Sequence, residues 1–220
     1  MQKNKSIIQL IYFNFPFWRV DVCKLTLAIG GISYEEKIIS KKYFILNKEK
    51  KEFPFGQVPV LKVDDNIIAQ TSAMVRYCGK LSKLYSSDVM VCAKIDQVID
   101  FANDVTNLLI PSIRETDVSK RKVLRQELNI RILPKWLGYL NRFLKNNKTS
   151  NFFLTENFTI ADIIVWRILL WLTSGKLEGI SLDFKNEFQG LENYFQFISQ
   201  QEILTSTNEY DFIINNQHII

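Results

Sequence analysis

The chain has 220 residues, of which 47% are hydrophobic, 13% aromatic and 23% charged. This composition indicates a globular protein with a sizeable core and excludes disordered, collagen-like and disulfide-scaffold classes. The net charge is +5, but basic residues alternate with acids, as in residues 48–52, so we expect a solvated surface and no nucleic-acid partner. The single histidine, His218, lies near the C-terminal end, which argues against triads and most zinc sites.

The cysteines and the apolar runs indicate a cytoplasmic protein. Cys23, Cys78 and Cys92 form no CxxC or pairing pattern, so we expect small buried hydrophobic side chains in a reducing compartment. The apolar run at residues 7–13 is only as long as a strand and has no small-residue cleavage pattern. No run reaches the roughly 20 apolar residues that cross a bilayer, so no stable membrane insertion is expected.

The first 81 residues predict a βαβ unit followed by a ββα unit. Apolar and β-branched runs predict the strands. Apolar residues at helical spacing, which stops at Gly30 and Gly31, predict the first helix. Thr71 or Ser72 is expected to cap the second helix. The expected elements are a strand over 7–13, a helix over 19–29, a strand over 33–40, a hairpin over 58–63 and 66–69, and a helix over 71–81.

The rest of the chain predicts helices alone. Residues 82–88 are polar and are expected to form a linker. Helical periodicity follows over 89–109, 120–144, 160–172 and 191–198, and Thr159 with Asp162 has the spacing of a capping box. The predicted fold class is therefore α/β plus all-α: a small α/β domain at 1–81, then an all-helical domain at 89–220.

Two motifs carry a resemblance to a known family. They are FPFGQVPVL at residues 53–61 and QTSAMVRY at residues 70–77, in the predicted βαβ-ββα context. Together they resemble the cytosolic glutathione transferases, most closely the sigma-like class, which uses a catalytic tyrosine. The resemblance implies a thioredoxin-like glutathione-binding domain, an all-helical domain with an apolar substrate site, glutathione as co-substrate, a homodimer and no metal.

The resemblance implies that Tyr12 is catalytic, since the tyrosine-type enzymes keep their hydroxyl at the end of the first strand. A thiol has a pKa of about 8.5, and a phenol that donates a hydrogen bond to the thiolate lowers it. Arg19 matches the family arginine that supports this tyrosine if the loop has one inserted residue. Without the insertion, Trp18 takes the arginine position.

The same resemblance implies that Gln57, Val58 and Pro59 bind glutathione. In the family the peptide bond before this proline is cis, an isomer that is nearly confined to X-Pro bonds. The backbone N–H and C=O of Val58 would then pair with the cysteinyl backbone of glutathione, as an added strand does. An ordinary trans proline that opens a strand is the alternative.

The two carboxylates of glutathione need their own partners. Gln70 and Thr71 stand at a helix N-terminus, whose free N–H groups suit the γ-glutamyl carboxylate, although a simple helix cap is the alternative reading. For the glycine carboxylate, counting back from Gly56 gives Lys50, whereas pairing Phe44 with the family aromatic gives Lys48. We favour Lys50, and a solvated lysine is the alternative for either one.

An acidic helix face is expected in the second domain. Asp96, Asp100, Asn103 and Asp104 recur at helical spacing. By resemblance, Asp104 would reach the γ-glutamyl amine bound to the neighbouring subunit of a homodimer. Some sigma-like enzymes gather magnesium between such acids, but Asn103 weakens this reading here. A solvated acidic face is the alternative.

Bulky residues depart from the small ones that the family commonly has in the first loop. Phe13, Phe17 and Trp18, with Phe15, either line the pocket for the electrophile or crowd it. Leu108, within residues 107–111, and the C-terminal residues 210–214 would complete an apolar wall.

The predicted function is a glutathione transferase that conjugates glutathione to small apolar electrophiles or reduces peroxides. Two alternatives are an isomerase similar to prostaglandin D synthase and a non-catalytic ligand-binding or structural protein with the same fold.

Overall fold

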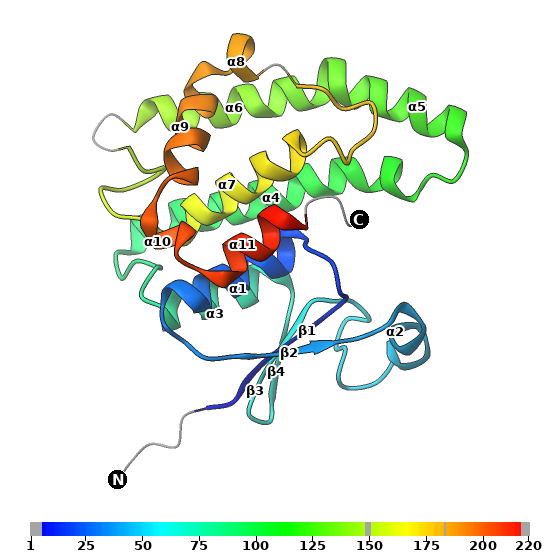
Figure 1. The fold of residues 1–220 in the computed structure, drawn as a ribbon, viewed down its shortest axis with the longest axis vertical. Helices are drawn as coiled ribbons and strands as arrows, with labels where there is room; N and C mark the ends of the chain where they lie inside the picture. Colours follow the sequence, from blue (N-terminus) through cyan, green and yellow to red (C-terminus); the bar gives the residue numbers. More distant parts are fainter. Residues whose placement is uncertain (1–5, 148–150, 183, 217–220) are drawn as a thin grey trace. The chain divides into compact units, whose positions relative to one another are not determined.

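The computed structural model describes residues 6–147, 151–182 and 184–216, so His218 lies outside the described residues. The chain divides into two compact units (Figure 1). One unit is Met1–Tyr85 together with Thr207–Ile220, and the other is Ser86–Ser206. The predicted linker lies between helices that end at Leu81 and begin at Val89.

The first unit contains a four-stranded sheet in the order β2-β1-β3-β4. β1 pairs parallel with β2 and antiparallel with β3, which pairs antiparallel with β4. The parallel pair and the hairpin confirm the predicted βαβ-ββα order, with strands that are shorter at several ends than their apolar runs. The strands are β1 (Ile8–Tyr12), β2 (Glu35–Ile38), β3 (Val60–Val63) and β4 (Asn66–Ala69).

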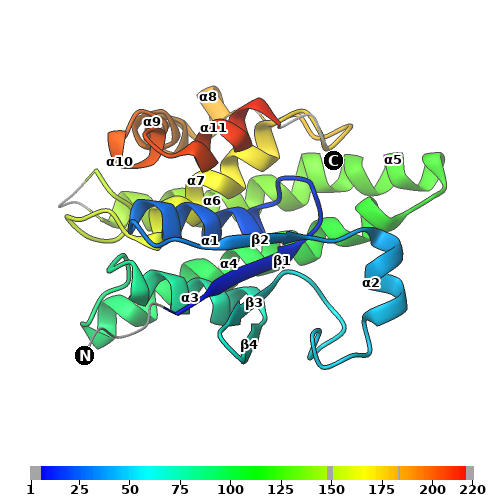
Figure 2. The same cartoon turned by 60° about the horizontal axis from the view of Figure 1, so that its bottom comes forward.

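Two helices connect these strands, α1 (Trp18–Ile29) and α2 (Lys41–Asn47), and a third, α3 (Thr71–Leu81), follows β4. α1 and α3 pack against each other. α2 lies apart from them, beside the end at which the chain leaves β2 (Figure 2). The sequence did not predict α2. It has seven residues, none of them buried, and Ile45 and Leu46 are exposed, so its apolar side chains do not mark one inward face.

The helix α11 (Asn208–Asn215) belongs to the first unit and packs on α1, which differs from the predicted division at residue 89. Ile213 is 1% exposed, and the Tyr34 hydroxyl donates a hydrogen bond of 2.7 Å to Glu209 Oε1. The Lys24 ammonium lies 5.4 Å from the centre of the Phe212 ring. These contacts join the end of the chain to the first unit, an assignment that helical periodicity alone does not predict.

All the secondary-structure elements that the structure describes in the second unit are helices, and loops join them. The predicted helix over 120–144 is three consecutive segments, because a π-helical turn separates two α-helices. α4 is longer than predicted and continues through Pro111. The segments are α4 (Val89–Arg114), α5 (Val118–Glu127), η1 (Leu128–Ile132), α6 (Leu133–Asn146), α7 (Ile160–Thr173), α8 (Phe184–Glu187), α9 (Gln189–Ser199) and α10 (Glu202–Thr205).

α7 is the centre of this unit, since every residue from Ile160 to Leu172 is buried. Its predicted capping box is confirmed. The Asp162 carboxylate accepts hydrogen bonds from the backbone N–H groups of Phe153 and Thr159, both at 2.8 Å, and from the Tyr194 hydroxyl at 2.9 Å. Burial raises the pKa of Asp162 even though these donors favour the ionised form.

The three cysteines are free thiols; Cys23 and Cys78 are buried as expected, whereas Cys92 is half-buried. Within the ranges that the structure describes, no helix combines the length and the apolar character needed to cross a membrane.

Candidate functional site

Tyr12 is the last residue of β1, and its ring is held by its neighbours in the loop. Its backbone C=O accepts a hydrogen bond of 2.9 Å from the N–H of Ile39, which follows β2. The ring centroid lies 5.3 Å from those of Phe13 and Phe15, and the side chain is 8% exposed. Aromatic pairs at such distances stabilise the packing of the ring at the end of the strand.

The loop after Tyr12 keeps most of its aromatic residues partly accessible. Phe13, Phe15 and Phe17 are half-buried, and the Phe13 and Phe15 rings stack at 5.8 Å. Trp18 differs from them, because it begins α1 and is 0% exposed. It therefore has no surface on which a ligand can rest in this structure, which departs from its predicted place in an apolar substrate site.

Arg19 connects Tyr12 with the start of α3. Its Nη1 donates a hydrogen bond of 3.4 Å to Thr71 Oγ1, and its guanidinium lies 5.3 Å from the centre of the Trp18 ring. Burial lowers the pKa of Arg19, and the charge interaction with Tyr12 acts in the opposite direction. A phenol, a guanidinium and a hydroxyl at a helix N-terminus thus converge, although Thr71 is 52 positions from Arg19 in the sequence.

Gln70 and Thr71 begin α3 in an arrangement that differs slightly from the prediction. Gln70 is the N-cap, its side chain makes no capping hydrogen bond, and Thr71 is the first helical residue. The Gln70 backbone has φ 71° and ψ 122°, a positive φ that non-glycine residues seldom adopt. Such strained residues cluster at ligand sites. Gln70 is exposed and Thr71 is 4% exposed.

The predicted backbone-binding motif precedes β3. The Val58–Pro59 peptide bond is cis, as the resemblance implies. Gln57 is exposed, and Val58 is half-buried against a core cluster that includes Ile11 and Phe53.

The loop between α2 and β3 encloses a pocket of about 660 Å³. Lys48 and Lys50, the two alternatives for the glycine carboxylate, both line it, so the structure does not choose between them. The complete lining is Lys48, Glu49, Lys50, Lys51, Phe53, Pro54, Phe55 and Gly56. The three lysines make the pocket suited to an anionic group.

The predicted residues of the second unit lie on α4. Asp100 and Asp104 are exposed, and Asp96, Asn103 and Leu108 are half-buried. The continuous helix places the acids on one face, as their spacing predicts. Among the described residues no group of three or more histidine, cysteine, aspartate or glutamate side chains is arranged to hold a metal ion.

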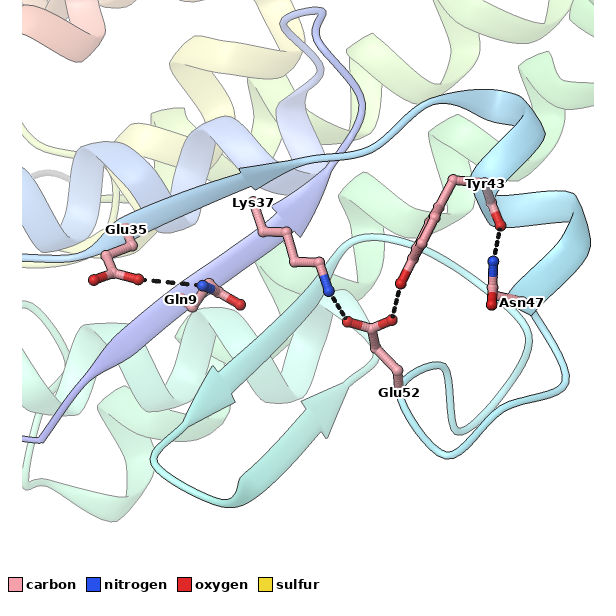
Figure 3. Close-up of polar contacts among 6 residues, drawn as sticks. All are labelled: Gln9, Glu35, Lys37, Tyr43, Asn47 and Glu52. Atoms are coloured by element: carbon pink, nitrogen blue, oxygen red, sulfur yellow. Dashed lines mark hydrogen bonds and ion pairs between the residues drawn. The ribbon is translucent and has the colours of Figure 1, made fainter.

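A polar contact beside the pocket has no signal in the sequence. Glu52, in the loop, accepts hydrogen bonds from Lys37 in β2 and Tyr43 in α2 (Figure 3). No motif marks these residues, since they come from three different segments. The alternation of charge around residue 52 predicts a solvated surface, whereas the structure pairs Glu52 with Lys37.

Two family models match the chain. One is "Glutathione S-transferase, N-terminal domain" over residues 8–80, and the other is "Glutathione S-transferase, C-terminal domain" over residues 103–206. Together they cover more than half of the sequence.

Curated relatives agree with the family models. A glutathione S-transferase of Plasmodium falciparum is 32% identical over 183 residues, which covers 73% of this chain and 78% of the relative. A hematopoietic prostaglandin D synthase of Gallus gallus is 31% identical over 154 residues, which covers 70% of this chain and 73% of the relative.

Solved structures share the fold. A C. elegans glutathione transferase superimposes with a TM-score of 0.76 at 23% identity and covers 91% of this chain and 95% of its own. A prostaglandin synthase D of Nilaparvata lugens gives the same TM-score and identity and covers 95% and 97%.

Proposed function

The chain belongs to the glutathione S-transferase family, and on that premise we propose that Tyr12 ionises the glutathione thiol for attack on small apolar electrophiles. The observation that carries this proposal is the convergence of Tyr12, Arg19 and Thr71 at one end of the sheet. Packing alone does not require a phenol, a guanidinium and a helix N-terminus together.

Tyr12 would act as a hydrogen-bond donor to the thiolate. Only the thiolate attacks electrophiles well, and each unit by which its pKa falls corresponds to about 1.4 kcal/mol. The phenol keeps its own proton while it stabilises the sulfur anion, and the thiol proton passes to solvent. The transfer then forms a bond between sulfur and the electrophilic carbon and releases the leaving group, or adds the sulfur across an activated double bond.

Arg19 would strengthen this donor. A cation near the phenol makes its hydrogen more acidic and stabilises the negative charge that gathers on the sulfur. The contact between Arg19 and Thr71 also supports a role in holding the thiol end and the γ-glutamyl end of the site in one geometry.

The tripeptide would lie along the edge formed by three segments. The γ-glutamyl carboxylate would meet the N-terminus of α3 at Gln70 and Thr71, and the cysteinyl backbone would pair with Val58, beside Gln57 and the cis proline Pro59. The glycine carboxylate would enter the lysine-lined pocket, where we favour Lys50 over Lys48.

The electrophile and the partner subunit belong to the same proposal. The half-buried rings of Phe13 and Phe17 would form an apolar wall with broad specificity. The protein would work as a cytoplasmic homodimer in which Asp104 contacts the γ-glutamyl amine bound to the neighbouring subunit. It would need no resident metal.

A prostaglandin D synthase-like isomerase is the second candidate, because relatives with that name match the chain. It would use the same thiolate with a more selective apolar pocket. A non-catalytic carrier is a third candidate within the fold.

The test combines binding with turnover. The purified protein should be retained on immobilised glutathione and should conjugate glutathione to a chloronitrobenzene electrophile, a reaction followed by absorbance. Peroxide reduction and prostaglandin H2 isomerisation should be assayed in parallel. Retention without turnover on any of the three substrates would support the carrier, and isomerisation that exceeds conjugation would support the isomerase.

A further inference from the structure

Three side chains contact one another where β2, α2 and the loop between α2 and β3 come together. The Lys37 ammonium in β2 donates a hydrogen bond to Glu52 Oε1, and the Tyr43 hydroxyl in α2 donates one of 3.1 Å to Glu52 Oε2 (Figure 3). The Lys37 ammonium also lies 5.5 Å from the centre of the Tyr43 ring. We call Lys37, Tyr43 and Glu52 the outer triad. Each carboxylate oxygen of Glu52 thus connects the loop to a different element.

An apolar contact joins the residues that follow two members of this triad in the sequence. Phe44 and Phe53, the next residue after Tyr43 and the next after Glu52, have ring centroids 5.3 Å apart in an edge-to-face arrangement. Phe53 is buried in the cluster that contains Ile11. The loop is therefore fastened to α2 at residues 52–53 in two layers, with a polar layer outside and an apolar layer inside.

Backbone hydrogen bonds link residues 52–53 to the rest of the pocket loop. Three turns follow one another in the loop: Lys50 N–H donates to Asn47 C=O at 2.8 Å, Phe53 N–H to Lys50 C=O at 2.9 Å, and Gly56 N–H to Phe53 C=O at 2.8 Å. Residues 52–53 lie inside this series, between the lysines at 48–51 and the turn at Gly56. A shift of Glu52 would therefore move groups on both sides of the pocket.

Charge favours the triad over a wide pH range. Burial opposes ionisation of Glu52, but the hydrogen bonds from Lys37 and Tyr43 and the charge of Lys62 outweigh it and lower its pKa. The hydrogen bond to Glu52 raises the pKa of Lys37. The ion pair is lost only when the pH falls far enough to protonate the Glu52 carboxylate or rises far enough to deprotonate the Lys37 ammonium. Because the first pKa is lowered and the second is raised, both groups stay charged across neutral pH.

We propose that Lys37, Tyr43 and Glu52 are positioning residues that preorganise the lysine-lined pocket for the glycine carboxylate of glutathione. They act through the loop and do not touch the tripeptide. The proposal rests on the proposed function of this site. A binding loop that is already held in one conformation does not lose conformational entropy when the ligand binds. If only a fraction of the molecules has the loop in that conformation, the apparent affinity falls in proportion to that fraction.

The experiment compares two ligands on the full-length protein. Calorimetry gives the dissociation constants of glutathione and of γ-glutamylcysteine, which lacks the glycine and leaves the pocket empty. Glu52→Ala should weaken glutathione binding by about three- to tenfold, a range set by the modest strength of partly exposed ion pairs. It should leave γ-glutamylcysteine binding at the wild-type value. The rate at saturating glutathione should not change, because the triad does not reach the sulfur.

Further variants separate positioning from loss of folding. Lys37→Met should reproduce the effect of Glu52→Ala, and Tyr43→Phe should give a smaller one, because it removes one hydrogen bond and keeps the ring. The matched control is Glu35→Gln, since Glu35 accepts a hydrogen bond of 3.2 Å from Gln9 on the same sheet (Figure 3) and is not among the residues that line the pocket. It should leave both dissociation constants unchanged.

The outcomes are distinct. Equal weakening of both ligands by Glu52→Ala, or no weakening of glutathione, would overturn the positioning role and leave the proposed function standing. A wild-type protein that binds neither ligand would overturn the proposed function and this inference with it. A loss confined to glutathione supports the triad.

Discussion

At the scale of single residues, the chemistry depends on how a few polar groups reach one point. Tyr12 lies at a strand end, its ring is packed between Phe13 and Phe15, and Arg19 lies near it on the following helix. A phenol that is fixed in this way loses little entropy when it donates a hydrogen bond to the sulfur anion, so more of that hydrogen bond's strength lowers the pKa of the thiol.

The first prediction concerns this hydrogen bond. Tyr12→Phe removes only the hydroxyl and keeps the ring contacts, so the melting temperature and glutathione affinity should stay near wild type. Turnover at neutral pH should fall by about 10- to 1000-fold. The rise of kcat/KM with pH should move upward toward the pKa of free thiol, near 8.5. Stopped-flow absorbance across pH 6–9 measures both effects, and unchanged turnover would remove Tyr12 from the mechanism.

The position of a candidate site residue at a strand or helix end is easier to predict from sequence than its exposure to solvent. Pro59, Gln70 and Thr71 lie in the two motifs and Tyr12 at the end of the first predicted strand, and the structure has each one at or next to a strand or helix end. Whether the bulky loop faces a ligand depends on packing that no local pattern describes. Trp18 is the example, because its place in the core follows from the contacts of a whole helix.

At the scale of elements, periodicity predicted long helices and missed short or interrupted ones. α7 was expected because its apolar run follows a capping box. α2 was not, because its exposed isoleucine and leucine obscure any inward face. The interruption at η1 has no signal either, since a π-turn changes the hydrogen-bond register without changing the residue types.

The second prediction tests the cap of α7. Asp162→Ala leaves two buried backbone N–H groups and the Tyr194 hydroxyl without their acceptor, so the free energy of unfolding should fall by about 3 kcal/mol. Asp117→Ala is the matched control, because Asp117 caps α5 at an exposed position through one hydrogen bond of 3.0 Å to Lys120 N–H. That change should lower the unfolding free energy by about 1 kcal/mol or less. Urea denaturation followed by tryptophan fluorescence measures both, and equal losses would contradict the special role of Asp162.

At the scale of the whole molecule, the chain order does not follow the compact units. The second unit lies in the sequence between two parts of the first, since α11 packs with α1. The N-terminal domain therefore completes its packing only after the helical unit has been made. The stability of the glutathione domain should thus depend on residues that a division at position 89 assigns to the other domain.

The third prediction tests this dependence with two adjacent isoleucines. Ile213 is 1% exposed and Ile214 is 37% exposed on the same helix. Ile213→Ala should lower the free energy of unfolding by about 2–4 kcal/mol, because it leaves a cavity against the first unit. Ile214→Ala should lower it by less than about 1 kcal/mol. Urea denaturation measures both changes, and similar small losses for the two variants would show that α11 adds little to the first unit.

The fourth prediction concerns the proposed homodimer. If Asp104 contacts the amine of glutathione bound to the neighbouring subunit, Asp104→Ala should weaken glutathione binding by about tenfold, since it removes a charge-assisted contact. The wild-type protein should lose the same affinity when it is diluted below its dimer dissociation constant, and the variant should show no further loss. Lys94→Met, at an exposed position earlier on the same helix, is the control for a general effect of changing the α4 surface. Calorimetry over a range of protein concentrations, with sedimentation velocity to follow the dimer, separates the effect of Asp104 from the effect of dimerisation. Wild-type glutathione affinity in Asp104→Ala would exclude the cross-subunit contact, even in a protein that dimerises.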